Sequence, residues 1–261
     1  MLLNYLLKPQ ALNETDQKHG NIFILHGLFG SLSNLSPLAK SLASRQQTIC
    51  VDLRNHGNSQ HSKIMTYDAM ANDIFTLADH LDIEHFSIIG HSMGGKVAMS
   101  CALQQPQRVN KLVIADIAPV SYDNKHSSVF AGLNAIRNCK IENKQEADII
   151  LSQYVKEAGV RQFLLKSLRL KNNQYDFQFN LDALSRNYDH ICSWPEYSSA
   201  FVNQTLFIKG ANSDYINTQS QPVIQRLFPN ASGKIIENTG HWLHAEKPDI
   251  FNRLVGKFFS V

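Results

Sequence analysis

The chain has 261 residues, 43% of them hydrophobic and 18% charged, which is ordinary for one large α/β domain or two small ones. Its 25 basic and 22 acidic residues leave a net charge of +3, and this balance argues against a nucleic-acid partner. The sequence has no apolar run as long as a bilayer-spanning helix, so we expect no membrane span.

The first nine residues are mostly apolar, but Asn4 interrupts them and they end at Lys8 and Pro9 without a basic leader. We therefore interpret residues 1–9 as a first strand rather than as an export signal. The four cysteines are widely separated, at positions 50, 101, 139 and 192. Without an export signal, this spacing predicts reduced thiols in a cytoplasmic protein and no cysteine-based metal site.

Short apolar strands alternate with amphipathic helices in the first half of the chain. The predicted strands are residues 21–26, 48–52, 86–89 and 111–116, and the predicted helices are residues 32–44, 67–81 and a helix that follows residue 92. This alternation predicts an α/β protein with a mostly parallel, twisted sheet and helices on both faces.

The alternation stops between residues 119 and 200, where helical patterns occur without a convincing buried strand. These helices are predicted at residues 127–138, 144–158, 161–168 and 181–188, and Asn172 and Asn173 are candidates for the turn of a small hairpin. The alternation then resumes, with strands at residues 204–210 and 233–237 and helices at residues 219–228 and 249–259. We predict a core of residues 1–118 and 201–261 with an inserted helical cap of residues 119–200.

Ser92 lies in the turn between a predicted strand and a predicted helix, within Gly90-His91-Ser92-Met93-Gly94. The pattern Gly-x-Ser-x-Gly alone is weak evidence, but a strand-to-helix turn is the context in which a strained serine presents its hydroxyl above the sheet. The glycines are needed where a side chain would collide with the neighbouring strand or helix. Ser92 is therefore the candidate nucleophile.

His241 is the candidate base, because it follows the last predicted strand and ligands of parallel sheets bind beyond the carboxyl ends of the strands. His91 is expected to point away from the site, and His26 to stabilise its own loop. The backbone N–H groups of Leu28 and Met93 are the expected donors to an oxyanion that forms beside Ser92.

Two carboxylates are candidates for the acid that would orient His241: Asp116 follows one predicted strand and Asp214 another. The residues favour Asp116, although either position can also be explained as a helix cap or a turn. The cluster Asp52-x-Arg54-x-x-Gly57-x-Ser59 is interpreted as a braced loop beside the sheet, and contact with substrate is its alternative role.

The chain resembles the α/β-hydrolases and, more narrowly, the bacterial YbfF-type esterases. The resembling segments are residues 26–31, 52–59, 90–96, 116–119, 163–167 and 240–248, which extend over nearly the whole chain. The resemblance implies a serine carboxylesterase that acts through Ser92 and His241 on short acyl esters, with acyl-CoA thioesters as further candidates. The wider fold usually places its acid where this chain has Ser213, and this departure is a second reason to favour Asp116.

Two other functions remain open from the sequence. The same site can support perhydrolysis of the haloperoxidase type or carbon–carbon bond hydrolysis, and a hydrolase scaffold can bind a ligand without turnover. The expected partner is a small acyl ester or acyl-CoA, without nucleic acid, metal or organic cofactor, and the expected state is a monomer or a weak homo-oligomer.

Overall fold

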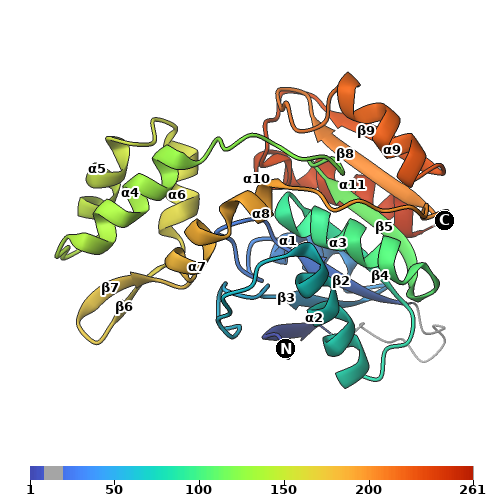
Figure 1. The fold of residues 1–261 in the computed structure, drawn as a ribbon, viewed down its shortest axis with the longest axis horizontal. Helices are drawn as coiled ribbons and strands as arrows, with labels where there is room; N and C mark the ends of the chain where they lie inside the picture. Colours follow the sequence, from blue (N-terminus) through green and yellow to red (C-terminus); the bar gives the residue numbers. More distant parts are fainter. Residues whose placement is uncertain (9–19, 261) are drawn as a thin grey trace.

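The computed structural model describes residues 1–8 and 20–260, and Pro9 of the predicted first strand lies outside them. Seven of the described strands form one sheet in the order β1-β3-β2-β4-β5-β8-β9 (Figure 1). The strands are Tyr5–Lys8 (β1), Asn21–Leu25 (β2), Gln47–Val51 (β3), Phe86–His91 (β4), Val109–Ala115 (β5), Thr205–Gly210 (β8) and Ala231–Ile236 (β9). Within this sheet β1 pairs antiparallel with β3 and the other pairings are parallel, as predicted for a mostly parallel sheet.

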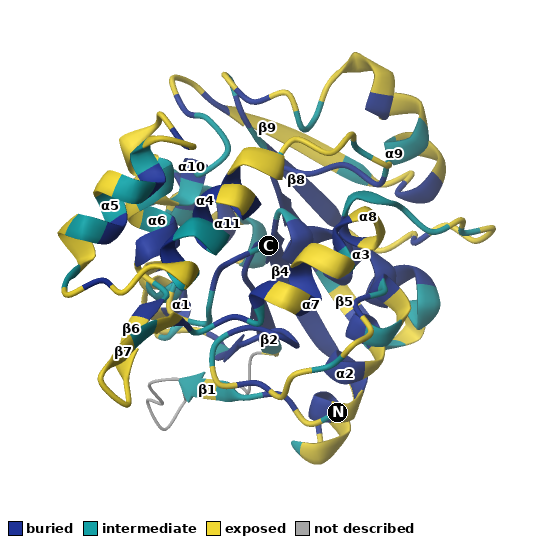
Figure 2. Cartoon of the chain, turned by 60° about the vertical axis from the view of Figure 1, so that its left-hand side comes forward, coloured by how far each residue is buried: buried dark blue, intermediate teal, exposed yellow. Residues whose placement is uncertain are grey.

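The middle strands of the sheet are buried on both faces, as the dark strands in Figure 2 show. Alternate residues of β2 belong to different cores: Phe23 and Leu25 to one, Ile22 and Ile24 to the other. The first core is covered by α2 (Tyr67–His80), α3 (Met93–Gln104) and α9 (Gln221–Leu227), and the second by α1 (Ser36–Leu42), α10 (Leu243–Glu246) and α11 (Pro248–Phe259). Continuous apolar strands are the sequence pattern of a sheet covered in this way.

The register aligns the carboxyl ends of the central strands. Leu25 of β2 lies opposite Gly90 of β4, which lies opposite Ile114 of β5. Ile114 is in turn paired with Phe207 of β8. The loops that leave these strands therefore begin at the same edge of the sheet, where a ligand site of a parallel sheet is expected.

The segment between β5 and β8 contains five helices and a two-stranded sheet among the described residues. They are α4 (Ser127–Asn138), α5 (Lys144–Ser152), α6 (Ala158–Leu165), β6 (Leu168–Lys171), β7 (Gln174–Phe177), α7 (Leu181–Arg186) and α8 (Tyr188–Cys192). In Figure 1, α4, α5, α6 and the hairpin lie together to one side of the large sheet.

The predicted bounds of several helices are wrong by one turn or more. The helix predicted over residues 144–158 ends at Ser152, and residues 158–165 form a separate helix. The predicted turn at Asn172 and Asn173 is confirmed: both have positive φ, 50° and 62°, a conformation that asparagine tolerates better than most residues. Similarly, α1 starts at Ser36 rather than at residue 32, because the preceding residues form turns and the amide of Leu32 donates to Asp52.

Candidate active site

Ser92 occupies a strained turn between β4 and α3. Its φ is 54° and its ψ −123°, outside the regions that L-residues favour. A Cβ on Gly90 would lie 2.2 Å from the carbonyl oxygen of Gly94, and a Cβ on Gly94 would lie 2.5 Å from that of His26. The two glycines are thus required for strand and helix to approach this closely, and the turn places the hydroxyl of Ser92 at the cavity.

The structure brings Ser92, His241 and Asp116 together from three loops. Nε2 of His241 lies 2.9 Å from Oγ of Ser92, and Nδ1 of His241 lies 2.7 Å from Oδ2 of Asp116. Because the ionised carboxylate only accepts, Nδ1 carries the proton and Nε2 is free to accept one from Ser92. Asp214, the other candidate, is exposed and its backbone oxygen accepts from Asn217.

Asp116 is completely buried, and its carboxylate is held by groups from the last residue of β8 and from the loop that follows it. The amide of Gly210 donates to Oδ1 over 3.0 Å, and the hydroxyl of Ser213 donates to Oδ2. Asp116 itself has a φ of 53°, and its amide donates to the carbonyl of Ile208. The buried carboxylate is therefore hydrogen-bonded on both oxygens and fixed in orientation.

His91 does not point away from the site, and this expectation is wrong. Its Nε2 donates to the carbonyl of His241 over 2.8 Å, and its ring lies 4.7 Å from that of His241 and 4.4 Å from that of His244. Burial lowers the pKa of His91 well below its usual value and that of His244 to about 3. The strand β4 continues through His91, whereas the predicted strand ended at Ile89. Side chains alternate between the two faces of a strand, so extending the predicted strand by two residues would have indicated the direction of the His91 side chain.

His26 bonds the loops on either side of it. Its Nδ1 lies 2.7 Å from the carbonyl of Gly27, and its Nε2 accepts from the amide of Leu53 over 3.1 Å. His56 is arranged in the same way, with Nδ1 on the carbonyl of Arg54 and Nε2 on the amide of Phe29. Burial lowers the pKa of His26 to about 4 and that of His56 to about 3, so both rings are neutral at neutral pH.

The cluster around Asp52 and Arg54 braces loops and does not line the cavity. Oδ1 of Asp52 accepts from the amide of Leu32, and its Oδ2 accepts from the amide of Asn58. Arg54 pairs with the buried Asp73 over 2.7 Å.

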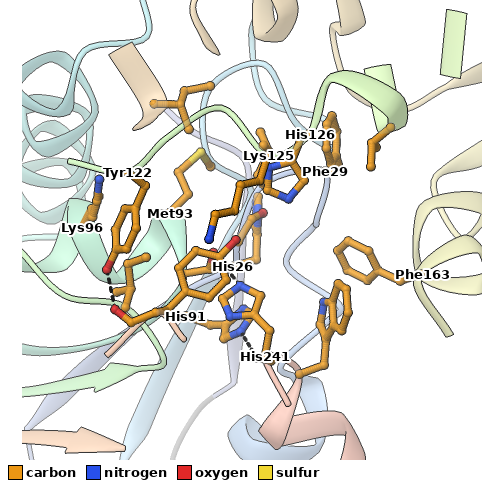
Figure 3. Close-up of a pocket in the computed structure, with 18 of the residues that line it drawn as sticks. His26, Phe29, His91, Met93, Lys96, Tyr122, Lys125, His126, Phe163 and His241 are labelled. Atoms are coloured by element: carbon orange, nitrogen blue, oxygen red, sulfur yellow. Dashed lines mark hydrogen bonds between the residues drawn. The ribbon is translucent and has the colours of Figure 1, made fainter. Parts of the chain in front are cut away.

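A cavity of about 100 Å³ opens at Ser92 and His241, and both Leu28 and Met93 line it. Figure 3 shows Met93, His26 and His91 around His241, with Phe163 on another side. Met93 is the first residue of α3, where a backbone N–H has no acceptor within its own helix. Part of the wall comes from the segment between β5 and β8, which contributes apolar side chains such as Val129, Val160 and Leu164 as well as the polar Asp123 and Lys125.

Several residues of this cavity, among them Tyr215, Tyr122 and Lys96, were not singled out in the sequence. Tyr215 stacks on His241, Tyr122 bonds the loop that carries Tyr215, and Lys96 of α3 is buried behind them. Nζ of Lys96 donates to the carbonyls of Cys192 and Ser193, each over 2.9 Å, and burial lowers its pKa to about 7. The position of this lysine among the apolar residues of the helix was the sequence feature that could have indicated a buried amine.

Within residues 1–8 and 20–260, no three His, Cys, Asp or Glu side chains are placed to hold a metal ion. The same residues include no helix that combines the length and the apolar character needed to cross a bilayer.

Comparison with known proteins assigns the chain to a family. Residues 20–138 match the model of the alpha/beta hydrolase fold, and the chain is 40% identical over 246 residues to esterase YbfF of Escherichia coli, covering 93% of this chain and 95% of that protein. The chain belongs to the α/β-hydrolase family, as its motifs indicated.

Two further comparisons agree with this assignment. The chain is 42% identical to the sn-1-specific diacylglycerol lipase ABHD11 of Danio rerio, over 87% of this chain and 74% of that protein. A solved marine microorganism esterase superposes with a TM-score of 0.92 at 35% identity, over 98% of this chain and 99% of the other. The protein is a hydrolase related to esterases and lipases, with the fold that the sequence predicted.

Proposed function

We propose that the protein is a serine carboxylesterase that cleaves short-chain acyl esters, and acyl-CoA thioesters by the same chemistry, through an acyl-enzyme. The observation that carries this proposal is the continuous contact from Ser92 through His241 to Asp116, over 2.9 Å and 2.7 Å. Such a contact activates a hydroxyl that is otherwise a weak nucleophile.

The first half of the reaction forms the acyl-enzyme. Oγ of Ser92 attacks the acyl carbon while its proton passes to Nε2 of His241, and Asp116 stabilises the imidazolium. The developing oxyanion accepts from the backbone N–H groups of Leu28 and Met93; the position of both residues at the cavity supports this role. The imidazolium then gives its proton to the departing alcohol or thiol.

The second half of the reaction hydrolyses the acyl-enzyme. His241 takes a proton from a water molecule, the resulting hydroxide attacks the same carbon, and Ser92 leaves with the proton returned. All proton transfers use side chains of this chain.

The size of the cavity supports a short acyl group. A volume of about 100 Å³ has room for several non-hydrogen atoms, since one water molecule needs roughly 10–15 Å³ on this scale. We further propose that residues 119–200 form a cap domain, because the cavity wall formed by Val160, Phe163 and Leu164 comes from this segment. A cytoplasmic location is proposed on the four free thiols.

A series of p-nitrophenyl acyl esters and acyl-CoA thioesters tests this function, with Ser92→Ala as the inactive variant. We expect turnover that is highest for short chains and falls by more than about 10³-fold in Ser92→Ala. A fluorophosphonate should label the wild type and the matched control Ser44→Ala, which changes an exposed serine, but not Ser92→Ala. Turnover that survives in Ser92→Ala would refute the proposal, and tight binding without product release would favour a ligand-binding protein.

A further inference from the structure

The aromatic ring of Tyr215 is stacked on the imidazole of His241. The two ring centroids are 4.2 Å apart and the ring planes are inclined by 30°. The face of a phenol ring carries negative electrostatic potential, so it attracts a cation placed over it. A stack of this kind is more favourable when the imidazole is protonated than when it is neutral.

Tyr215 is held in this position from two directions. The hydroxyl of Tyr122 donates to the carbonyl of Tyr215 over 2.6 Å and accepts from the amide of Ala118 over 2.9 Å (Figure 3 shows Tyr122 with this hydrogen bond). The amide of Tyr215 donates to Oγ of Ser213 over 3.3 Å, and that hydroxyl bonds Asp116. One short loop therefore contacts both the acid and the base.

We propose that Tyr215 is a positioning residue that holds the imidazole of His241 toward Ser92 and stabilises its protonated form during acyl transfer. The inference rests on the proposed function. As the Oγ–carbon bond forms, the proton of Ser92 moves to Nε2 of His241, and it leaves with the alcohol or thiol when the carbon–leaving-group bond breaks. Tyr215 neither gains nor loses a proton, and it acts only through the ring that it contacts.

The other titratable groups of the cavity around His241 come from several elements and loops. Asp116 follows β5, His91 ends β4, His244 lies in α10, His26 follows β2 and His126 precedes α4, while Asp123, Lys125 and Lys96 of α3 also line the cavity. Lys96, with a pKa lowered by burial to about 7, titrates within the measured pH range, and its contribution is common to the wild type and the Tyr215 variants. Burial lowers the pKa of His91 well below its usual value, that of His126 to about 4 and that of His244 to about 3. These three imidazoles therefore keep the same neutral state across the range from pH 6 to 8.

Tyr215→Leu tests the inference, because leucine covers the imidazole without an aromatic face. We expect kcat to fall about threefold to tenfold with KM changed less than about twofold. The acid limb of kcat/KM should move about 0.5 pH unit lower, because the imidazolium loses a favourable contact. Tyr215→Phe, which keeps the ring, should retain the wild-type values.

The control is Tyr175→Leu, which makes the same exchange in β7 at a residue that does not line the cavity. A wild-type kcat and acid limb in Tyr215→Leu would overturn the inference, as would an equal change in Tyr215→Phe. If Tyr215→Leu loses its folded near-ultraviolet spectrum, Tyr215→Met provides the aliphatic comparison.

Titration of the His241 imidazole by NMR separates this inference from the proposed function, since it requires no turnover. The midpoint should be about 0.5 pH unit lower in Tyr215→Leu than in the wild type. If Ser92→Ala retains activity, the proposed function fails while this midpoint still tests the stack. If Ser92→Ala is inactive and the midpoint does not move, only the role of Tyr215 is wrong.

Discussion

The hydroxyl of Ser213 donates to Oδ2 of Asp116, the same carboxylate oxygen that lies 2.7 Å from Nδ1 of His241. The loop after β8 therefore contributes a hydroxyl at the position where the wider fold usually has its acid, and the carboxylate comes from the end of β5. An acid after β8, as in the wider fold, and an acid after β5, as in this chain, both bring a carboxylate to the Nδ1 side of the imidazole. The relationship leads to the first two predictions.

Asp116→Asn should lower kcat about 10³- to 10⁴-fold, because an amide does not stabilise the imidazolium and favours the wrong tautomer. Asp214→Asn, which changes an exposed carboxylate on the same loop as Ser213, should leave kcat within about twofold of the wild type. Steady-state kinetics on one p-nitrophenyl ester measures both. Equal, mild losses would show that Asp116 is not the acid.

The double variant Asp116→Asn/Ser213→Asp should recover at least about tenfold of the activity lost in Asp116→Asn. The hydroxyl of Ser213 already contacts Oδ2 of Asp116, the oxygen that faces His241. An aspartate at residue 213 therefore extends from a backbone position within reach of the imidazole. The recovery is measured as kcat against the single variant, with circular dichroism to establish folding. A folded double variant without recovery would mean that the backbone at residue 213 does not direct a carboxylate at the imidazole.

Gly90→Ala should reduce the free energy of unfolding by about 3 kcal/mol and abolish fluorophosphonate labelling. Its Cβ would lie 2.2 Å from the carbonyl of Gly94, so strand and helix have to separate. Gly256→Ala is the control, because a Cβ there meets nothing within 4 Å and lies inside α11, where alanine should add about 0.5–1 kcal/mol. Urea unfolding measures the free energy of unfolding of both variants and the wild type. A Gly90→Ala protein of wild-type stability would contradict the close packing of Gly90 against the carbonyl of Gly94.

The free energy of unfolding should decrease as the pH falls below about 6.5. In the folded protein the pKa of His26 is lowered to about 4 and that of His56 to about 3, whereas unfolded imidazoles bind protons near pH 6.5. The unfolded chain therefore binds more protons over this interval, which costs the folded state on the order of 2 kcal/mol per histidine between pH 6.5 and 4.5.

Urea unfolding at several pH values measures this effect in the wild type and in His56→Gln. The slope of the free energy of unfolding against pH reports how many more protons the unfolded state binds than the folded state. Glutamine does not titrate, so this difference should be smaller by about one proton in His56→Gln. The contribution of these two histidines is fully present well above pH 6.5, where both states carry neutral imidazoles. An unchanged slope in His56→Gln would show that this histidine becomes protonated in the folded state.

The sequence alone was sufficient to predict the succession of strands along the chain and the turn at Ser92. In a chain where strands and helices alternate, an apolar run such as residues 21–26 predicts a strand buried on both faces of a parallel sheet. Gly90 and Gly94 lie where strand and helix approach so closely that only glycine fits. These features depend on a few neighbouring residues, so the local sequence contains the information.

Helix bounds in the segment between β5 and β8 were less predictable. Residues 144–158 have a continuous helical pattern, yet the helix ends at Ser152, where the chain turns to bring Leu151 and Val155 into the core. Propensity is a weak guide where packing against other elements decides the end of a helix.

The sequence by itself determined which residues leave the sheet at one edge, and so it selected Ser92, His241, Leu28, Met93 and two possible acids. Only the tertiary structure decided that Asp116 bonds His241, that the ring of His91 packs against it and that the ring of Tyr215 stacks on it. The reason is physical: contacts between residues 91 or 116 and residue 241 depend on strand register and on the direction of each side chain at the end of its strand. One residue of slippage reverses that direction, and no local pattern specifies it.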